Sequence, residues 1–182
     1  MNNITQVPLG NILTKPKPSN NGGGTFIIWL AGFMDGEGSI SVCRATIHRA
    51  KREINPIHTV AVDIYNTNYE ILKRIKDEFG IGKVQTYSAK NRLTGGKPVY
   101  HWRATRRQAL PLLQMVYPYL ILKKEQAYLA IKLQQHIMCY GKNKPWGYSI
   151  DPKELAFRDE VYFKMKTLNK KGKVIEKHAE EE

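Results

Sequence analysis

One stretch, from Thr25 to Ile40, constrains the fold more than any other part of this chain. It reads T-F-I-I-W-L-A-G-F-M-D-G-E-G-S-I and is apolar on nearly every side up to Met34, which predicts a buried helix. At about 12 residues the apolar run is too short to cross a bilayer. Gly32 and Gly36 lie four residues apart, and therefore on one face of the helix. A second helix could approach that face until the two backbones touch.

The end of this predicted helix carries two acidic residues. Asp35 and Glu37 lie beside the partially negative C-terminus of the helix, where carboxylates are disfavoured. Gly36 and Gly38 then turn the chain into a strand. A local rule broken at a buried, glycine-fixed turn indicates function. A divalent cation would reverse the penalty, because Mg²⁺ accepts the oxygens of carboxylates and exposed helix carbonyls.

The segment from Leu30 to Gly38, L-A-G-F-M-D-G-E-G, resembles the nine-residue signature of the LAGLIDADG homing endonucleases, with Glu in place of the final Asp. The alternative interpretation is a buried helix that simply ends at a glycine. Nine positions in order, with three glycines and two acids, are much more specific than a lone glycine motif. The resemblance covers about residues 25–140 and implies a fold of the α+β class built on an αββαββα unit.

The net charge of +13 is unusual for a chain of 182 residues. The first 150 residues hold 21 Lys/Arg against eight Asp/Glu, so the whole excess lies on the part of the chain that carries the motif. This predicts a polyanionic partner, most simply nucleic acid, with an anionic membrane as the weaker alternative. Cys43 and Cys139 form neither a zinc pattern nor a disulfide framework. The N-terminus lacks a signal-peptide core, so we expect an intracellular location with the DNA (cytoplasm, nucleoid or organelle matrix) and no secretion.

The chain divides into a flexible N-terminal arm (1–24), a single domain (25–169) and a polar tail (170–182). After the motif, residues 39–43, 59–64, 83–87 and 99–103 have strand patterns. Capping boxes at Thr67 with Glu70 and at Thr105 with Gln108 predict two helix starts. Helices at about 122–140 and from Asp151 onward complete the order α-β-β-α-β-β-α-α-α. We therefore predict a four-stranded antiparallel sheet, curved as a DNA-binding saddle, with additional C-terminal helices.

One face of such a sheet is polar and basic, and could lie along the major groove, where every base pair presents a distinct pattern. For each residue singly, a solvated strand face is the competing interpretation. The predicted base-reading residues, by alternation along the strands, are Ser41, Cys43, Asp63, Lys83, Gln85, Tyr87, His101 and Arg103, with Arg44, Thr46, His48 and Arg49 added near the end of the first hairpin, where the register is open.

The resemblance also implies catalytic roles. Glu37 matches the metal-binding acid and the Gly36 carbonyl its backbone co-ligand, while Asp35 would be a supporting group at the helix end. Lys123 matches the lysine that polarises solvent near the cleaved phosphate, with a surface cation or helix cap as the alternative. A polar residue after the second strand orients the attacking water in this family. Asn66 is the predicted match, with Asp63 as the second choice, although Asn66 could instead cap the next helix.

A lone copy of the signature implies a homodimer on a near-palindromic site, because a double-strand cut needs two active sites. The predicted dimer interface is the motif helix, with Gly32, Gly36, Trp29 and Phe33. The implied function is an intron-encoded, Mg²⁺-dependent endonuclease that makes a staggered cut in double-stranded DNA, with Mn²⁺ or Ca²⁺ able to substitute in binding. The alternative is a non-cleaving binder of the same fold, such as an RNA splicing maturase or a DNA-binding regulator. A basic structural protein without sequence preference would not explain the buried acidic turn.

Overall fold

The structure is a computed structural model, and it describes residues 23–49, 52–88, 95–142 and 150–170. Within these ranges the side chains at the end of the first hairpin, 47–55, are not described. The predicted arm at 1–24 and tail at 170–182 lie almost entirely outside the described residues. In the part of the chain that the structure describes, no helix has both the length and the apolar character needed to cross a membrane.

The order of elements follows the prediction. The elements are α1 (Gly23–Glu37), β1 (Gly38–Arg49), β2 (Arg52–Asn66), α2 (Tyr69–Phe79), β3 (Lys83–Ser88), β4 (Val99–Thr105), the 3₁₀ turn η2 (Arg106–Gln108), α3 (Ala109–Val116), the 3₁₀ turn η3 (Tyr117–Tyr119), α4 (Lys124–Gly141) and α5 (Pro152–Leu168). Apart from the short η2, the chain through α3 is an αββαββα unit. The α+β class and the predicted unit are therefore confirmed.

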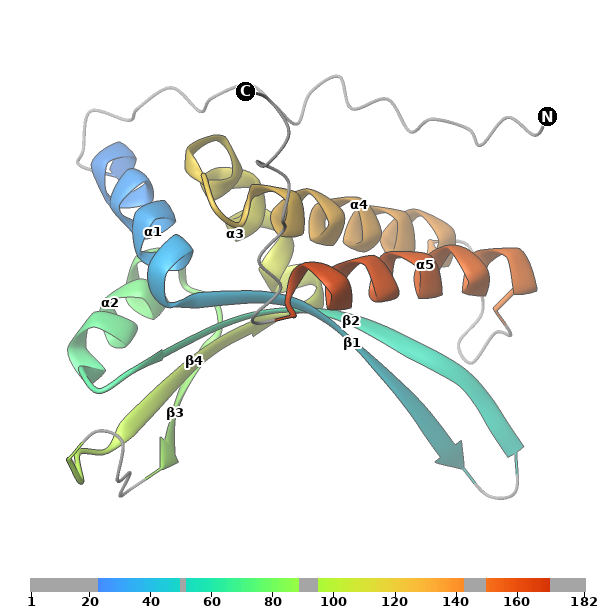
Figure 1. Ribbon diagram of the computed structural model, residues 1–182, viewed down its shortest axis with the longest axis horizontal. Coiled ribbons are helices and arrows are strands. Elements are labelled where there is room, and N and C mark those ends of the chain that lie inside the picture. The colour runs from blue at the N-terminus through green and yellow to red at the C-terminus, as the bar shows by residue number, and fades with distance from the viewer. Residues whose placement is uncertain (1–22, 50–51, 89–94, 143–149, 171–182) are drawn as a thin grey trace, which may run out of the picture.

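The sheet has four strands in the order β1-β2-β4-β3, and every neighbouring pair is antiparallel. Figure 1 shows it as a curved saddle, with the helices gathered above one face and the concave face below left bare. Alternation along the strands explains this division, because successive side chains point to opposite faces. Ile40, Val42, Val60, Val62 and Ile64 are buried beneath the helices, as predicted.

The core lies between this face of the sheet and the helices. Leu30 and Met34 of α1 are fully buried, and so is Trp102 of β4. Trp102 also explains one glycine: a Cβ on Gly82 would lie 2.7 Å from the indole ring, and the φ of Gly82 is +78°. Only glycine combines this backbone conformation with so close an approach to the ring.

Two predicted capping boxes differ from the structure. Helix α2 is capped by Asn68 and not by Thr67, because the Asn68 side-chain oxygen accepts from the backbone N–H groups of Glu70 and Ile71. At Thr105 the capping box is wrong, since its side chain makes no capping hydrogen bond. A 3₁₀ turn with a positive φ of 53° at Arg106 comes first, and α3 begins only after it.

Beyond the four-stranded sheet, β1 and β2 continue as a two-stranded ribbon. Pairing of β2 with β4 ends at Ala61 opposite Thr105, whereas β1 and β2 remain paired as far as Arg49 opposite Arg52. A register shift lies between Ala45 and Ile47. Figure 1 shows this ribbon descending away from β3 and β4. We call residues 42–49 and 52–60 the ribbon.

Candidate active site

The end of α1 is joined to the start of α4 by Asp35. Its carboxylate accepts hydrogen bonds from the backbone N–H groups of Ile121 (2.7 Å), Leu122 (3.2 Å) and Lys123 (2.9 Å). These residues lead into α4, whose own N-cap, Lys123, makes no side-chain capping bond. Asp35 therefore supplies from another helix the acceptor that the α4 N-terminus needs, and a negative charge there is favourable. This resolves the unfavourable placement of Asp35 at the end of its own helix.

Lys123 returns the contact. Its ammonium group donates to the backbone carbonyl of Asp35, at the partially negative end of α1. The side chain of each residue is therefore bonded to the backbone of the other. A surface lysine would have no such fixed position. The reciprocal contact brings the charge of Lys123 to the turn that carries Glu37.

Glu37 differs from its neighbour Asp35. It is the last residue of α1 and is exposed. Among the described residues, no donor bonds to its carboxylate, whereas Asp35 accepts three hydrogen bonds. Gly36, beside it, is also exposed. The turn thus presents one free carboxylate and a helix-terminal carbonyl to whatever approaches from outside.

Gly38 fixes this turn sterically. A Cβ on Gly38 would lie 2.8 Å from the Met34 carbonyl oxygen and 3.0 Å from its Cα, both backbone atoms that cannot move aside. The chain therefore passes directly from helix to strand with the strand folded against the last helical turn. As a result, Glu37 lies at the junction between the motif helix and the sheet.

The oxygens at this turn suit a hard divalent cation, but they are only part of a coordination shell. No group of three or more His, Cys, Asp or Glu side chains able to hold a metal occurs among the described residues. Glu37 is one carboxylate, and the carbonyl of Gly36 is a second oxygen of the kind that Mg²⁺ accepts. The donor set fits the chemistry of Mg²⁺, which usually completes its shell with water and with oxygens of the bound substrate.

The glycine face of α1 is open. An added Cβ on Gly32 or on Gly36 would meet nothing within 4 Å. On the same exposed side, Trp29 is 39% exposed and Ile28 is 54% exposed. Phe33 is partly buried and stacks on Trp29 with ring centroids 5.0 Å apart. The predicted interface residues therefore share one side of α1, which is open at the two glycines and partly exposed at Trp29 and Phe33.

Asn66, the residue predicted to orient water, ends β2. Its side-chain oxygen accepts from the backbone N–H of Asn68 at 2.8 Å, which shapes the turn into α2. Asn66 thus contributes to the start of α2 without capping it, because it supports the residue that does, Asn68. Its side-chain NH₂ group makes no hydrogen bond within the described residues.

The concave face of the sheet carries most of the predicted base-reading residues. Alternation and register place Ser41 and Cys43 on β1, Asp63 on β2, His101 and Arg103 on β4, and Lys83, Gln85 and Tyr87 on β3 on the side away from the helices. Cys43, Arg103, Lys83, Gln85 and Tyr87 are exposed there, and Ser41 is partly so. The structure thus brings eight of the predicted residues onto one face.

Two of these residues are occupied with each other. Asp63 is 8% and His101 is 9% exposed, and the Asp63 Oδ1 lies 2.6 Å from the His101 Nε2. The Arg103 Nε lies 3.3 Å from the same oxygen. A buried carboxylate needs such partners, because an unpaired charge there would be costly. Asp63 is therefore bound in an ion network, which leaves Asn66 as the better candidate for orienting water.

Tyr65 belongs to this face and was missed in the sequence. Its ring stacks on His101 with centroids 4.3 Å apart, and Tyr87 meets it edge-on at 5.0 Å. Burial, and then the nearby charge of Asp63, raises the pKa of Tyr65 above 10.0. The alternation that placed Asp63 outward would have identified Tyr65, had it been continued by two residues.

Arg44 is a correction to the prediction. It lies on the helix-covered side of β1, where its Nε donates to the Asp159 Oδ1 of α5 at 2.8 Å. Cys43, its neighbour, faces the opposite side. Thr46 is exposed next to the register shift in the ribbon. The side chains of His48 and Arg49, also predicted, lie outside the described residues.

Comparisons with known proteins bear on the family and the fold. The sequence model of the family described as LAGLIDADG endonuclease matches residues 30–134. The homing endonuclease I-CvuI, solved in complex with its target in the presence of Ca, has a TM-score of 0.65 and 21% identity, covering 83% of this chain and 86% of that one. The archaeal intron-encoded homing endonuclease I-Vdi141I, complexed with DNA, has a TM-score of 0.62 and 17% identity, covering 81% and 86%.

A third similar structure is the homing endonuclease I-TnaI, with a TM-score of 0.57 and 18% identity, covering 80% of this chain and 89% of that one. No curated protein matches the chain. At these identities the structural likeness establishes the fold. The family model matches more than half of the chain, from within α1 to the middle of α4.

Proposed function

Since the chain belongs to the LAGLIDADG endonuclease family, we propose that it is a site-specific endonuclease that cuts both strands of DNA with the help of a divalent metal. The proposed substrate is a long, near-palindromic site, and the proposed outcome is a staggered cut of the kind that starts intron homing. The similar proteins I-CvuI and I-Vdi141I were solved with DNA, and the net charge of +13 gives this chain the electrostatic basis for the same partner.

The observation that carries this proposal is the pair of acids at the end of α1. Asp35 is fully engaged in joining α1 to α4, whereas Glu37 keeps a free, exposed carboxylate two residues after the backbone carbonyl to which the Lys123 ammonium donates. A purely structural turn has no need of a second carboxylate that contacts nothing. A free carboxylate that can bind a cation, on the same turn that a lysine contacts, suits the hydrolysis of a phosphodiester, because cation and lysine would then act on one phosphate.

The roles of the residues follow from their positions. Glu37 and the Gly36 carbonyl would hold the metal, which when bound supplies charge neutralisation at the phosphate and a more acidic water. Lys123 would stabilise negative charge near the cleaved phosphate. Asn66 would orient the attacking water through its free NH₂ group. Mg²⁺ is the proposed ion, with Mn²⁺ or Ca²⁺ able to occupy the site in binding.

A homodimer would complete the site. Two copies of α1 packed through Gly32 and Gly36 would bury Trp29 and Phe33 and bring both Glu37 carboxylates together. The open glycine face supports this arrangement, since each glycine allows a second backbone to approach closely. An interface related by twofold symmetry uses the same patch on both copies and matches a palindromic duplex.

The concave face of the sheet is the proposed DNA-reading surface. A pair of strands fits the major groove, and side chains on alternate positions can reach base edges. Ser41, Cys43, Lys83, Gln85, Tyr87 and Arg103 would contact the bases directly. Asp63 would act mainly by positioning Arg103, and His101 by holding Asp63, because both are buried and meet at the same Asp63 oxygen that Arg103 contacts. Thr46, His48 and Arg49 would contact the DNA further along the ribbon.

The test starts from a library of random-sequence duplexes, because the target site is not known. Duplexes bound in Ca²⁺ are recovered over several rounds, cloned into a plasmid, and incubated with the protein in Mg²⁺ or in EDTA. Linearisation of the plasmid at one position in Mg²⁺, and not in EDTA, is the expected result. Selection of a consensus without cutting would support the non-cleaving binder instead. Recovery of no consensus would contradict both functions.

A further inference from the structure

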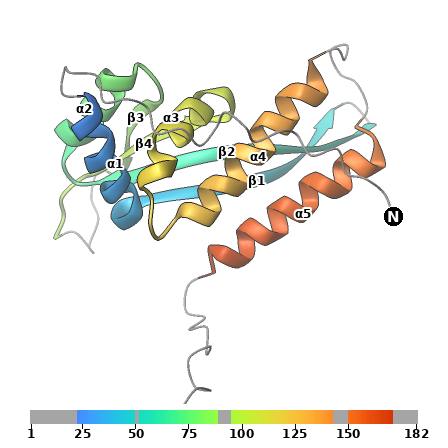
Figure 2. The same cartoon turned by 90° about the horizontal axis from the view of Figure 1, so that it is seen from above.

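The ribbon of β1 and β2 needs a support that the four-stranded sheet does not give it. Past Ala61 and Thr105 the ribbon has no β4 partner, and an isolated two-stranded hairpin is marginally stable in water. Helix α5 packs on the helix side of β1 and β2, and in Figure 1 it lies above the place where the ribbon leaves the sheet; Figure 2 shows it beside α4 from above. All of α5 falls outside residues 30–134, the part that the family model matches.

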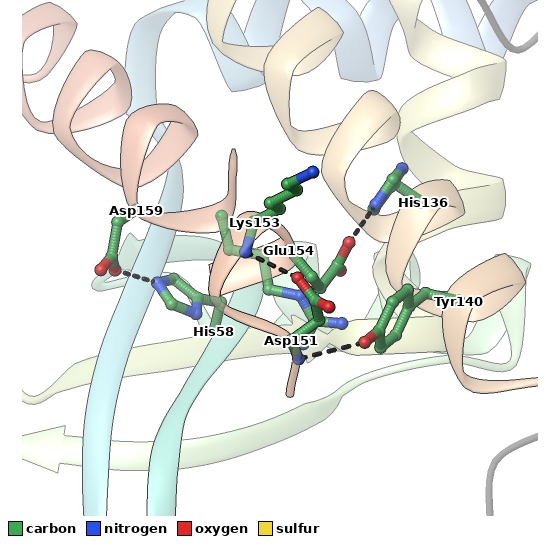
Figure 3. Close-up of polar contacts among 8 residues, drawn as sticks. His58, His136, Tyr140, Asp151, Lys153, Glu154 and Asp159 are labelled. Atoms are coloured by element: carbon green, nitrogen blue, oxygen red, sulfur yellow. Dashed lines mark hydrogen bonds and ion pairs between the residues drawn. The ribbon is translucent and has the colours of Figure 1, made fainter. Parts of the chain in front are cut away.

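One carboxylate connects α5 to both strands. The Asp159 Oδ1 accepts from the Arg44 Nε at 2.8 Å and lies 2.7 Å from the His58 Nε2. Arg44 and His58 are directly opposite each other in the ribbon. Asp159 therefore closes a contact across the two strands at the point where the ribbon leaves the sheet, and Figure 3 shows its bond to His58.

Further contacts fix both ends of α5. Near its start, Glu154 accepts from the Arg158 Nε and lies 2.6 Å from the His136 Nε2 of α4 (Figure 3). Just after its end, the Asn169 side chain donates to the Ile40 carbonyl of β1 at 2.9 Å. Because α5 is fixed to α4 and to the sheet, the ion contact at Asp159 sets the position of the ribbon relative to the rest of the domain.

The burial of His58 favours a permanent hydrogen bond to Asp159. The imidazole is fully buried, and its Nδ1 has no hydrogen-bond partner within the described residues. Burial lowers the pKa of His58 below 6.5, which outweighs the opposing hydrogen bond to Asp159. The neutral ring donates from Nε2 to Asp159 and leaves Nδ1 as a bare acceptor. Protonation would bury an N–H group with nothing to accept it.

We propose that Asp159 is a positioning residue for DNA recognition: by holding Arg44 and His58, it fixes the angle of the ribbon and so the reading of the outer base pairs of each half-site. This rests on the proposed function. The bare side of the ribbon, with Cys43 and Thr59, continues the concave reading face outward. A ribbon free to swing would keep its residues but lose their register on the DNA.

The first measurement needs no DNA. Hydrogen exchange of backbone amides is compared between the unmodified protein and Asp159→Asn. The matched control is Glu160→Gln, the same change in charge on an exposed neighbour. Asp159→Asn is expected to speed exchange in residues 42–49 and 52–60 by about tenfold, with little change in β3 and β4, because one charged hydrogen bond is worth about that factor. Arg44→Gln, which removes one of the two donors, should raise exchange in the same amides less.

The second measurement uses DNA selected from the random library. Asp159→Asn is expected to lose about tenfold in preference at each of the outermost base pairs, with inner preferences and the cut positions unchanged. Unchanged exchange, an even rise over the whole protein, or base preferences that fall equally at all positions would overturn the proposal. If no sequence is selected by the unmodified protein, the proposed function fails, and the exchange pattern still decides whether Asp159 holds the ribbon.

Discussion

The end of α1 and the first half of α5 both place acidic side chains close to cationic ones, but the acids have different partners. On α5, Asp159 and Glu154 are each bonded to an Arg and a His, so both carboxylates are paired within the fold. At the end of α1, the Asp35 carboxylate is likewise bonded, to three backbone N–H groups, whereas the Glu37 carboxylate has no partner among the described residues. The difference teaches that an acid with all its partners in the fold has a structural role, whereas the acid without a partner at a fixed turn is the candidate for the proposed chemistry.

Glu37→Gln should have the largest effect, because it changes the acid that has no partner in the fold. We expect cleavage of the selected plasmid to fall by roughly a thousandfold or more, because the metal loses its charged ligand. Binding of the selected duplex in Ca²⁺ and the free energy of unfolding should change little, since the carboxylate bonds to nothing in the described fold. Loss of binding with cutting intact would refute the assignment.

The open face of α1 gives the next largest effect. Gly32→Leu should convert the dimer to a monomer in sedimentation, because the side chain would force the two helices apart. The monomer itself should remain folded by circular dichroism, since a Cβ there meets nothing within 4 Å and glycine is a poor helix former. A Gly32→Leu protein that still sediments as a dimer would place the interface elsewhere.

Asp35→Asn tests the structural role of Asp35, which joins the end of α1 to the start of α4. The neutral side chain keeps one carbonyl oxygen for the three N–H groups that it serves, so we expect the free energy of unfolding to fall by about 1–2 kcal/mol in urea denaturation. Cleavage should fall less than in Glu37→Gln. An Asp35→Asn protein of unchanged stability but without activity would reverse the roles given to the two acids.

The smallest effect concerns pH. Because the pKa of His58 is lowered on folding, the unfolded chain binds the extra proton first, and stability should decline as the pH falls below 6.5. His58→Gln should remove up to about 1 kcal/mol of this decline between pH 7 and pH 5. The difference between the two proteins isolates His58 from the other histidines. Equal pH profiles would contradict a neutral, buried His58.

Asp159 contributes in a separate pH window. Its burial alone would raise its pKa, but the hydrogen bonds from Arg44 and His58 outweigh this and lower the pKa below 3.8. Its contribution is therefore present above pH 3.8 and is lost only as the pH falls further. The decline in stability predicted for His58 occurs at higher pH, so the two effects can be measured separately.

The sequence predicted the inner part of the molecule well, for local reasons. The alternation at Ile40, Val42 and Val60 places the strands, and the glycine-fixed turn at Gly36 and Gly38 identifies the candidate site without any long-range information. The capping-box pattern of Thr67 with Glu70 predicts Thr67 as the cap of α2, but the pattern alone does not exclude the neighbouring Asn68, which is also a residue type that caps helices.

The outer part could not be predicted in the same way. Arg44 was expected on the DNA-facing side because it is basic and near a hairpin end. Its partner, Asp159, is 115 residues further along the chain. Likewise, the link from Asp35 to Lys123 spans 88 residues. Contacts of this kind depend on the packing of α4 and α5, which no local pattern encodes.

The central claim is that two copies of α1 meet and bring their Glu37 carboxylates to a shared place at the cleaved phosphates. Anomalous diffraction from Mn²⁺ in crystals of the protein with its selected duplex tests this most directly. We expect Mn²⁺ density within bonding distance of a Glu37 carboxylate and a scissile phosphate, next to the twofold axis. Ordered Mn²⁺ at other side chains, with the two Glu37 residues far apart, would contradict it.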